Sequence, residues 1–210
     1  MKKGKISNAV IRRLPRYCRY LSSLHREGVE RISSSALGNN MGLTASQIRQ
    51  DLSCFGEFGQ QGYGYNVEKL YQEVSEILYL HKQREAVLIG VGNLGRALIQ
   101  NFDFSDSGFH LGAAFDIDPA LIGTEINGIP ILGALALENY LAEHDVAVAV
   151  LTLPGRYAQG MADMLMDKGV RGIWNFTNFD FEVKEEHNDV VVENIHFSDS
   201  LRVLSYQIGE

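Results

Sequence analysis

The sequence predicts a mixed α/β protein in which a small helical module precedes a doubly wound parallel sheet. Three observations predict this fold class. Basic residues are concentrated before residue 67. Apolar residues in that first part recur at intervals of three and four, as they do along one face of a helix. Beyond residue 82, apolar runs of strand length alternate with helical patterns, and three glycines follow the first run.

Length and charge suit two domains with different partners. A chain of 210 residues can form two modest domains, each with a core of its own. Residues 1–66 hold ten Lys and Arg against four acids, a net charge of +6, whereas residues 67–210 hold nine against 22, a net charge of -13. A compact basic module can neutralise DNA backbone charge, and an acidic one repels polyphosphate.

Several classes of protein are excluded by what the sequence lacks. There is no run of 18 apolar residues and no apolar stretch of a secretory signal, so we expect a cytoplasmic protein with no membrane partner. Cys18 and Cys54 have no metal-ligand neighbours, which favours two small buried residues over a redox pair. The histidines after residue 100 have no catalytic or metal-binding spacing, so neither a catalytic nor a metal site is predicted.

The first and last helices of the basic module follow from apolar spacing. Pro15 suits the first turn of a helix and disrupts an interior, so we expect a short turn at 8–13 and then a helix over about 15–26. VEKLYQEVSEILYLH at 67–81 predicts a further helix. The charged KQRE at 82–85 separates two periodicities and is the expected linker.

Between these helices the pattern predicts helix, turn, helix. The segment ISSSALGNNMG offers serines as caps and is expected to stop at Gly38 and Gly42. Thr44 and Gln47 have the spacing of a capping box, which predicts a helix from 45 to about 55.

This last helix carries the prediction of DNA reading. Ile48, Leu52 and Phe55 would hold it on the core, so its polar residues face outward, where such a helix enters a major groove. Arg can pair with guanine and Gln with adenine, and the glycine-rich GEFGQQGYGY that follows predicts a hairpin or wing. From helical pattern alone, a buried helical hairpin with a glycine-rich loop stays open. The predicted DNA-binding residues are Arg12, Ser33, Thr44, Ser46, Gln47, Arg49, Gln50, Gln60 and Tyr63.

The acidic part opens with a pattern typical of dinucleotide binding. In AVLIGVGNLGRALIQ the first glycine permits a tight strand-to-helix turn, the second lets a pyrophosphate approach, and the third allows close packing. Asp116 ends the next apolar run, 21 residues past Gly95, where a carboxylate binds ribose hydroxyls and repels a 2′-phosphate. NAD(H) is therefore favoured over NADP(H), although Asp116 could instead be a turn acid before Pro119.

Later segments continue the alternation. IPIL at 129–132, VAVAVLTLP at 146–154 and GIWNFTN at 172–178 predict strands, with helices between them. Ligands dock at the carboxyl ends of strands in such sheets. The predicted nucleotide-binding residues are Gly90, Val91, Gly92, Asn93, Leu94, Gly95, Arg96, Asp116, Thr152, Leu153 and Pro154.

The chain ends in an amphipathic helical pattern. Apolar residues fall at 197, 201, 204 and 208, with Asp199 in the first turn. Such a stripe needs a partner surface, which is either its own domain or a second subunit. A two-fold dimer would match two half-sites on DNA.

In this order, IRRLPRYCRYL, TASQIRQDLSCFGEFGQQGYGY, VLIGVGNLGRAL, FDIDP and VENIHFSDSLRVLSYQI resemble the Rex family of bacterial redox-sensing transcriptional repressors over essentially the whole chain. The resemblance implies a winged helix-turn-helix DNA-binding domain at 1–82, a Rossmann-type NAD(H)-binding domain at 83–194 and a domain-swapped dimerisation helix at 195–210. It implies a homodimer that binds an AT-rich inverted repeat in operator DNA, responds to the NADH/NAD+ ratio and leaves DNA when NADH binds. It also places Phe197 near the nicotinamide pocket.

The sequence departs from the family pattern at several positions. The wing has Gln60 and Gln61 where a basic residue is usual, and Gln50 stands where Lys is common. Fewer phosphate contacts predict a shallower salt dependence of DNA binding. His196 replaces an Asp that the family pairs with the position of Arg19, so that ion pair is not expected here.

Two other functions compete with this one. An NAD-dependent dehydrogenase needs a proton donor or acceptor beside the nicotinamide, and Tyr157 is not followed by the Tyr-x-x-x-Lys spacing. We therefore expect no enzyme activity. The other alternative is a nucleotide-binding structural module whose basic end binds a protein instead of DNA.

Overall fold

The computed structural model describes residues 6–56, 59–60 and 63–209. The chain divides into two compact units, Met1–His81 and Lys82–Glu210, and each is a fold of its own. Among the described residues, no helix is both long enough and apolar enough to cross a membrane.

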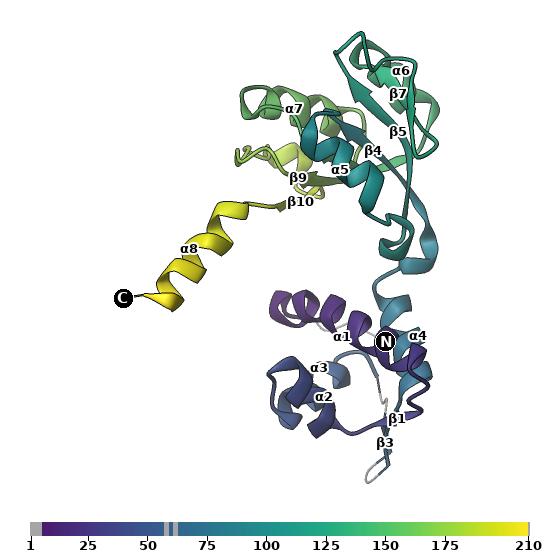
Figure 1. The fold of residues 1–210 in the computed structure, drawn as a ribbon, viewed down its shortest axis with the longest axis vertical. Helices are drawn as coiled ribbons and strands as arrows, with labels where there is room; N and C mark the ends of the chain where they lie inside the picture. Colours follow the sequence, from purple (N-terminus) through teal and green to yellow (C-terminus); the bar gives the residue numbers. More distant parts are fainter. Residues whose placement is uncertain (1–5, 57–58, 61–62, 210) are drawn as a thin grey trace. The chain divides into compact units, whose positions relative to one another are not determined.

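The first unit combines four helices with a small antiparallel sheet (Figure 1). Its helices are α1 (Asn8–Arg26), α2 (Ser34–Met41), α3 (Ala45–Ser53) and α4 (Val67–Ile77). Its strands are β1 (Arg31–Ile32), β2 (Gly59–Gln60) and β3 (Gly64–Asn66), in the order β1-β3-β2. The hairpin of β2 and β3 follows α3 directly, so the helix-turn-helix and its wing are confirmed.

Helix α1 corrects the expectation drawn from Pro15. The predicted turn at 8–13 does not exist, because α1 runs unbroken from Asn8 and holds Pro15 inside. A proline inside a helix costs about 3 kcal/mol. However, α1 buries Val10 and Leu14 before the proline and four more side chains after it, and each large one contributes about 1.5 to 3 kcal/mol. The continuous apolar face therefore outweighs the local cost.

Two other helix boundaries differ from the prediction. Gly38 does not stop α2 but lies buried inside it, where a Cβ would collide with the carbonyl oxygen of Leu43. Gly42 alone ends the helix, with a left-handed φ of 65°. Helix α4 stops at Ile77 instead of continuing to residue 81, since the chain turns at Tyr79 (φ 57°) into a short 3-10 helix, η1 (Leu80–Lys82).

The second unit is a seven-stranded sheet with the order β10-β9-β8-β4-β5-β7-β6, parallel except at β6. Its strands are β4 (Arg84–Ile89), β5 (Phe109–Asp116), β6 (Glu125–Ile126), β7 (Ile129–Gly133), β8 (Val146–Leu151), β9 (Gly172–Asn175) and β10 (Val191–Asn194). Its helices are α5 (Asn93–Asn101), α6 (Leu137–Glu143), α7 (Ala158–Asp167) and α8 (Phe197–Ile208). The strand order reverses on either side of β4, which confirms the doubly wound Rossmann-type sheet.

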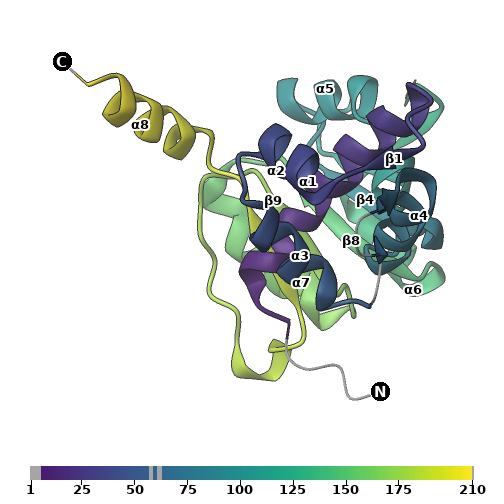
Figure 2. The ribbon, with the colours of Figure 1, turned by 90° about the horizontal axis from the view of Figure 1, so that it is seen from below.

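The sheet has a helix layer on each face. Helices α6 and α7 pack on one face and α5 on the other (Figure 2). On the α5 side the buried cluster joins Ile99 of α5 to Leu88 and Ala114 of the central strands. Helix α8 contributes no buried residue to either layer.

The charged segment 82–85 is not simply a linker. Arg84 and Glu85 already belong to β4, and the backbone N–H of Arg84 donates to Gly108 at 3.0 Å. Glu85 accepts a hydrogen bond from the Tyr140 hydroxyl at 2.6 Å. Because these polar partners are available at the amino-terminal end of this central strand, charged residues can begin it.

Candidate functional site

The glycine-rich turn between β4 and α5 is packed tightly at its first and third glycines. Gly90 has a φ of 98°, and a Cβ there would come within 2.9 Å of the Thr152 backbone. A Cβ on Gly95 would collide with the carbonyl oxygen of Gly90. Thr152 joins the same cluster, because its hydroxyl donates to Gly90 at 2.6 Å. These contacts match the tasks expected of the first and third glycines, which are a tight turn and close packing.

The middle glycine is different, since a Cβ on Gly92 would have no atom within 4 Å. Gly92 is also the N-cap of α5, and no side chain caps that end of the helix. The amides of the first turn of a helix carry partial positive charge and attract anions. The space beside the Gly92 backbone is therefore free, and it adjoins the uncapped N-terminus of α5. This arrangement suits a phosphate group.

The other residues predicted in this glycine-rich motif differ in how exposed they are. Val91 is buried in the turn, Leu94 is half-buried, and Asn93 and Arg96 are exposed. Leu153 and Pro154 follow β8, so they lie at the carboxyl edge of the sheet beside Thr152.

Asp116 ends β5 and binds the glycine-rich turn directly. One carboxylate oxygen accepts a hydrogen bond from the Val91 N–H, and the other accepts from Ile117 at 2.7 Å and Asp118 at 2.9 Å. Asp116 therefore has a structural role in the turn, whereas its predicted contact with a ribose stays a prediction. Two carboxylate oxygens offer about four acceptor sites, so these bonds orient Asp116 and still leave capacity for a ribose hydroxyl.

Phe197 begins α8, and its ring lies near Phe176 at the carboxyl end of β9. Its ring centroid lies 6.1 Å from that of Phe176, which follows β9. Phe197 itself is 55% exposed.

The first turn of α3 has the predicted cap. Thr44 Oγ1 accepts from the Gln47 N–H at 3.1 Å, and the Gln47 side chain accepts from the Thr44 N–H at 3.5 Å, which confirms the capping box. Ser46, Arg49 and Gln50 are exposed on this helix. An exposed polar face does not fit the alternative of a buried helical hairpin.

Other predicted DNA contacts lie on α1 and at the start of α2 in the same unit. Ser33 caps α2 by accepting from the Ala36 N–H at 3.0 Å, and Arg12 is exposed on α1. The Arg49 guanidinium donates to Ser34 at 3.0 Å, which links α3 to α2.

The wing carries an exposed aromatic side chain. Tyr63 is 70% exposed, and Arg31 donates to its carbonyl oxygen at 3.3 Å. The backbone of Gln60 belongs to β2, but its side chain lies outside what the structure describes, and Gln61 lies outside the described residues.

A buried charged cluster beneath α3 was missed from the sequence. Asp51 is 2% exposed and accepts from Arg13 at 2.7 and 2.8 Å and from the Tyr17 hydroxyl at 2.9 Å. Burial and then the bond to Asp51 raise the pKa of Tyr17, while the bond to Asp51 is the main cause of the raised pKa of Arg13. The signal in the sequence was an acid beside Leu52 on the apolar face of a helix, which requires a buried partner.

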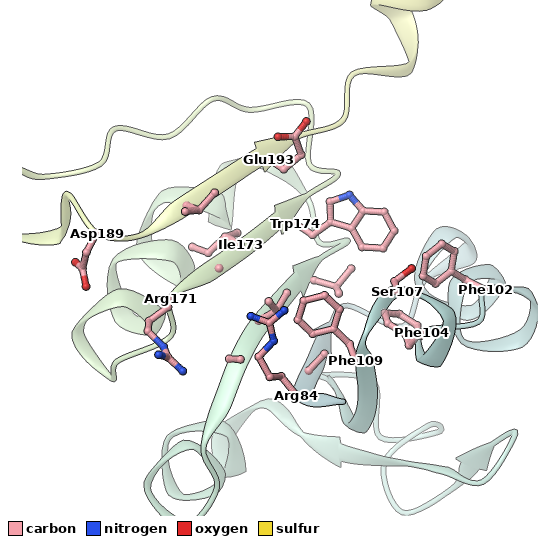
Figure 3. A pocket seen from close by; sticks show the side chains of 16 residues that line it. Arg84, Phe102, Phe104, Ser107, Phe109, Arg171, Ile173, Trp174, Asp189 and Glu193 are labelled. Atoms are coloured by element: carbon pink, nitrogen blue, oxygen red, sulfur yellow. The ribbon is translucent and has the colours of Figure 1, made fainter. Parts of the chain in front are cut away.

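A hollow on the α5 side of the sheet was also unexpected. Its volume is about 580 Å³, and Figure 3 shows Trp174 and Phe109 beside it. Arg84 lies 5.0 Å from the Phe109 ring and has a buried Nε with no hydrogen-bond partner. The hollow lies over the β8–β10 part of the sheet, and none of its lining residues comes from α8.

Two histidines in the second unit lie within hydrogen-bond distance of exposed carboxylates. His196 Nε2 lies 2.8 Å from Asp180, and His187 Nε2 lies 3.0 Å from Asp167. Asp167, His187 and Glu186 have a spacing that could hold a metal ion, but both carboxylates are exposed, and nothing else about the group indicates a metal.

Family models match both units. Residues 5–53 match the model described as "Putative DNA-binding protein N-terminus", and residues 81–179 match the model described as "CoA binding domain". The curated relatives include the redox-sensing transcriptional repressor Rex of Thermoanaerobacter pseudethanolicus, which is 48% identical over all of this chain and 92% of the relative. Rex of Clostridium tetani is also 48% identical, over all of this chain and 98% of its own.

Solved structures similar to this chain include those of a Rex-family repressor, RSP. RSP in complex with β-NAD+ and operator DNA is 47% identical, with a TM-score of 0.91 over 98% of this chain and 93% of that one. RSP in complex with β-NADH is 44% identical, with a TM-score of 0.88 over 98% of this chain and 95% of that one.

Proposed function

We propose that this chain, which belongs to the Rex family of redox-sensing transcriptional repressors, represses transcription as a homodimer on operator DNA and leaves the DNA when NADH binds its second unit. The observation that carries the nucleotide part is the bare backbone at Gly92 beside the uncapped end of α5. A cytoplasmic location is part of the same proposal.

The nucleotide would be held by backbone more than by side chains. The amides after Gly92 suit a pyrophosphate. Asp116, already oriented by three N–H donors, suits the adenine ribose and disfavours a 2′-phosphate. Thr152, Pro154 and Phe197 then surround the nicotinamide end. When bound, the nucleotide supplies the redox signal through its nicotinamide ring.

DNA would be read by α3 and its wing. The exposed Ser46, Arg49 and Gln50 lie on the helix that enters a major groove in this fold. Arg49 is already oriented by Ser34, which lowers the entropy lost on binding. An AT-rich inverted repeat is the proposed operator, as the resemblance to the Rex family implies, and a dimer requires two half-sites.

The homodimer would form by exchange of α8. Phe197, Leu201 and Leu204 of this helix are about half exposed or more, and Ile208 is 71% exposed. The hollow lined by Trp174 and the phenylalanines is an apolar surface that α8 of the same chain does not cover. We infer that α8 of a second copy packs there, since each surface would remove the other from water.

Release of DNA requires that NADH bind one dimer arrangement better than another. A ligand with equal affinity for both arrangements would shift nothing. A coupling free energy of about 1 to 3 kcal/mol would change DNA affinity by about 5- to 150-fold. Enzymatic hydride transfer is not part of the proposal, because the residues proposed around the nicotinamide end include no His, Lys or free carboxylate.

The test is a titration of the full-length protein with a fluorescent inverted-repeat duplex. Anisotropy is measured without nucleotide, with NAD+ and with NADH. We expect tight binding with NAD+ and binding at least about fivefold weaker with NADH. Equal duplex affinity in both nucleotides, or a monomer in sedimentation at the same concentration, would contradict the proposal.

A further inference from the structure

The turn after β9 is built around a buried asparagine. Asn175 is 1% exposed, and its side-chain oxygen accepts from Thr177 twice, from the N–H at 3.0 Å and from the hydroxyl at 2.7 Å. Its amide nitrogen donates to the Phe179 carbonyl at 2.7 Å. Because every polar atom of the asparagine side chain is used, residues 175–179 have one well-defined conformation.

The same turn holds the segment that leads into α8. The amide of Asn175 also donates to the Asn194 side chain at 2.8 Å, and the Ile195 N–H donates to the Asn175 carbonyl at 2.8 Å. One residue later, His196 Nε2 lies 2.8 Å from Asp180 Oδ1. An ionised carboxylate only accepts hydrogen bonds, so Nε2 is the donor. His196 is the N-cap residue of α8, and the pair therefore joins the start of the helix to the turn.

On its other side the turn touches the nucleotide crevice. Gly155 follows Pro154 at the carboxyl end of β8, and a Cβ at Gly155 would lie 3.1 Å from the Thr177 carbonyl oxygen and 3.4 Å from Phe179. The loop proposed to contact the nicotinamide end is thus in close packing with the turn. A displacement of this loop on nucleotide binding would press on the turn directly.

We propose that the turn 175–180 transmits the state of the nucleotide crevice to α8, with Asp180 and His196 as the positioning residues at the start of the helix. This inference rests on the proposed function, because it assigns the part of the chain that couples the two sites. It also accounts for His196 at a position where the family resemblance implies an acid. In this chain the partner is Asp180, within the same unit, in place of Arg19.

A double-mutant cycle on the exposed pair tests the proposal. Asp180→Ala, His196→Ala and the double variant are compared by the ratio of duplex dissociation constants in NADH and in NAD+. Each single variant should lower this ratio by about two- to fivefold, the range of one partly exposed side-chain hydrogen bond. The double variant should lower it no further, because both substitutions remove one interaction. The affinities for NADH alone and for duplex without nucleotide should stay within about twofold.

The chain offers a matched control pair. His187 and Asp167 have the same residue types and atoms at 3.0 Å, with side chains 16% and 60% exposed against 21% and 70% for His196 and Asp180. Alanine at either control residue should leave the ratio unchanged. Asn194→Ala, which removes the exposed partner of the buried asparagine, should lower the ratio in the same direction as Asp180→Ala.

Hydrogen exchange of the nucleotide-free protein provides a second readout. Asp180→Ala should speed exchange of the amides at 195–200, and Asp167→Ala should not. An unchanged ratio, strictly additive single effects or an equal response of the control pair would overturn the proposal. A wild-type protein with no nucleotide response would instead remove the proposed function, and the exchange data would then show only whether Asp180 anchors α8.

Discussion

The two units differ in the atoms that make their proposed contacts, which are side chains in the first unit and mainly backbone in the second. In Met1–His81 the contacts are exposed side chains on α3, above an ordinary helical backbone. In Lys82–Glu210 they are mainly backbone amides, and the critical positions are glycines that have no side chain. The first unit should therefore tolerate the loss of a contact side chain without unfolding, whereas the second should lose stability when a methyl group is added at Gly90 or Gly95.

The two units also differ in the polar groups that they bury. Among the described residues, the buried charge is Asp51 in the first unit, while the buried polar residues of the second unit are the neutral Asn175 and Thr177. A buried charge requires its partners at all times. The difference suggests that α3 is held rigidly by an ion pair, whereas the turn after β9 is held by neutral hydrogen bonds.

The largest effect should come from breaking the buried ion pair. Asp51→Ala leaves Arg13 without its carboxylate and the Tyr17 hydroxyl without its acceptor, so we expect the free energy of unfolding of the first unit to fall by about 3 to 5 kcal/mol. Urea denaturation measures it. Asp199→Ala breaks an exposed pair with Arg202 and serves as the control, with a loss of less than about 1 kcal/mol. A similar small loss at Asp51 would remove the contrast between the interiors.

The second largest effect should come from adding a methyl group to the glycine-rich turn. Gly95→Ala places a Cβ against the Gly90 carbonyl, so we expect the second unit to lose about 1 to 3 kcal/mol of stability and most of its NADH binding. Gly92→Ala meets open space and should leave thermal unfolding within about 0.5 kcal/mol, yet weaken NADH binding by about tenfold, or 1.4 kcal/mol. Unchanged NADH fluorescence titration for Gly92→Ala would show that no ligand approaches there.

Loss of a single contact should separate the two sites. Arg49→Ala should weaken duplex binding by about 1 to 3 kcal/mol and leave NADH affinity unchanged, because Arg49 is exposed on α3. Asp116→Ala should weaken NADH binding and leave duplex affinity without nucleotide unchanged. Anisotropy and NADH fluorescence on both variants measure this, and a loss of both activities in either variant would mean that the sites are not separate.

Alkaline pH should have the smallest effect and should act on both units. Burial, followed by a hydrogen bond to a carboxylate, raises the pKa of Tyr17 and the pKa of Tyr140. The unfolded chain therefore releases these protons first as the pH rises above about 10, so the stability present below that pH declines above it. Each tyrosine adds a slope of at most about 1.4 kcal/mol per pH unit. Urea denaturation at increasing pH should show a shallower decline in Tyr17→Phe, and an equal slope would contradict the assignment.

Local sequence patterns were sufficient to predict the main helices and strands and the glycine-rich turn of this protein. The capping box of Thr44 and Gln47, the three glycines after β4 and the alternation of strands and helices each depend on residues a few positions apart. Hydrogen bonds and apolar periodicity at that range are set by backbone geometry, so they can be read without knowing the fold. The resemblance of five such segments in order then indicated the family.

Tertiary structure alone decided what depends on distant partners. It kept α1 continuous through Pro15, because burial along the whole helix outweighs a local cost. It paired Asp51 with Arg13, 38 residues away, and Asp180 with His196, which follow the neighbouring strands β9 and β10. It also left a hollow over β8–β10 to which α8 contributes no lining residue among those the structure describes. These features arise from packing between elements, and the periodicity of any one element carries no record of what lies against it.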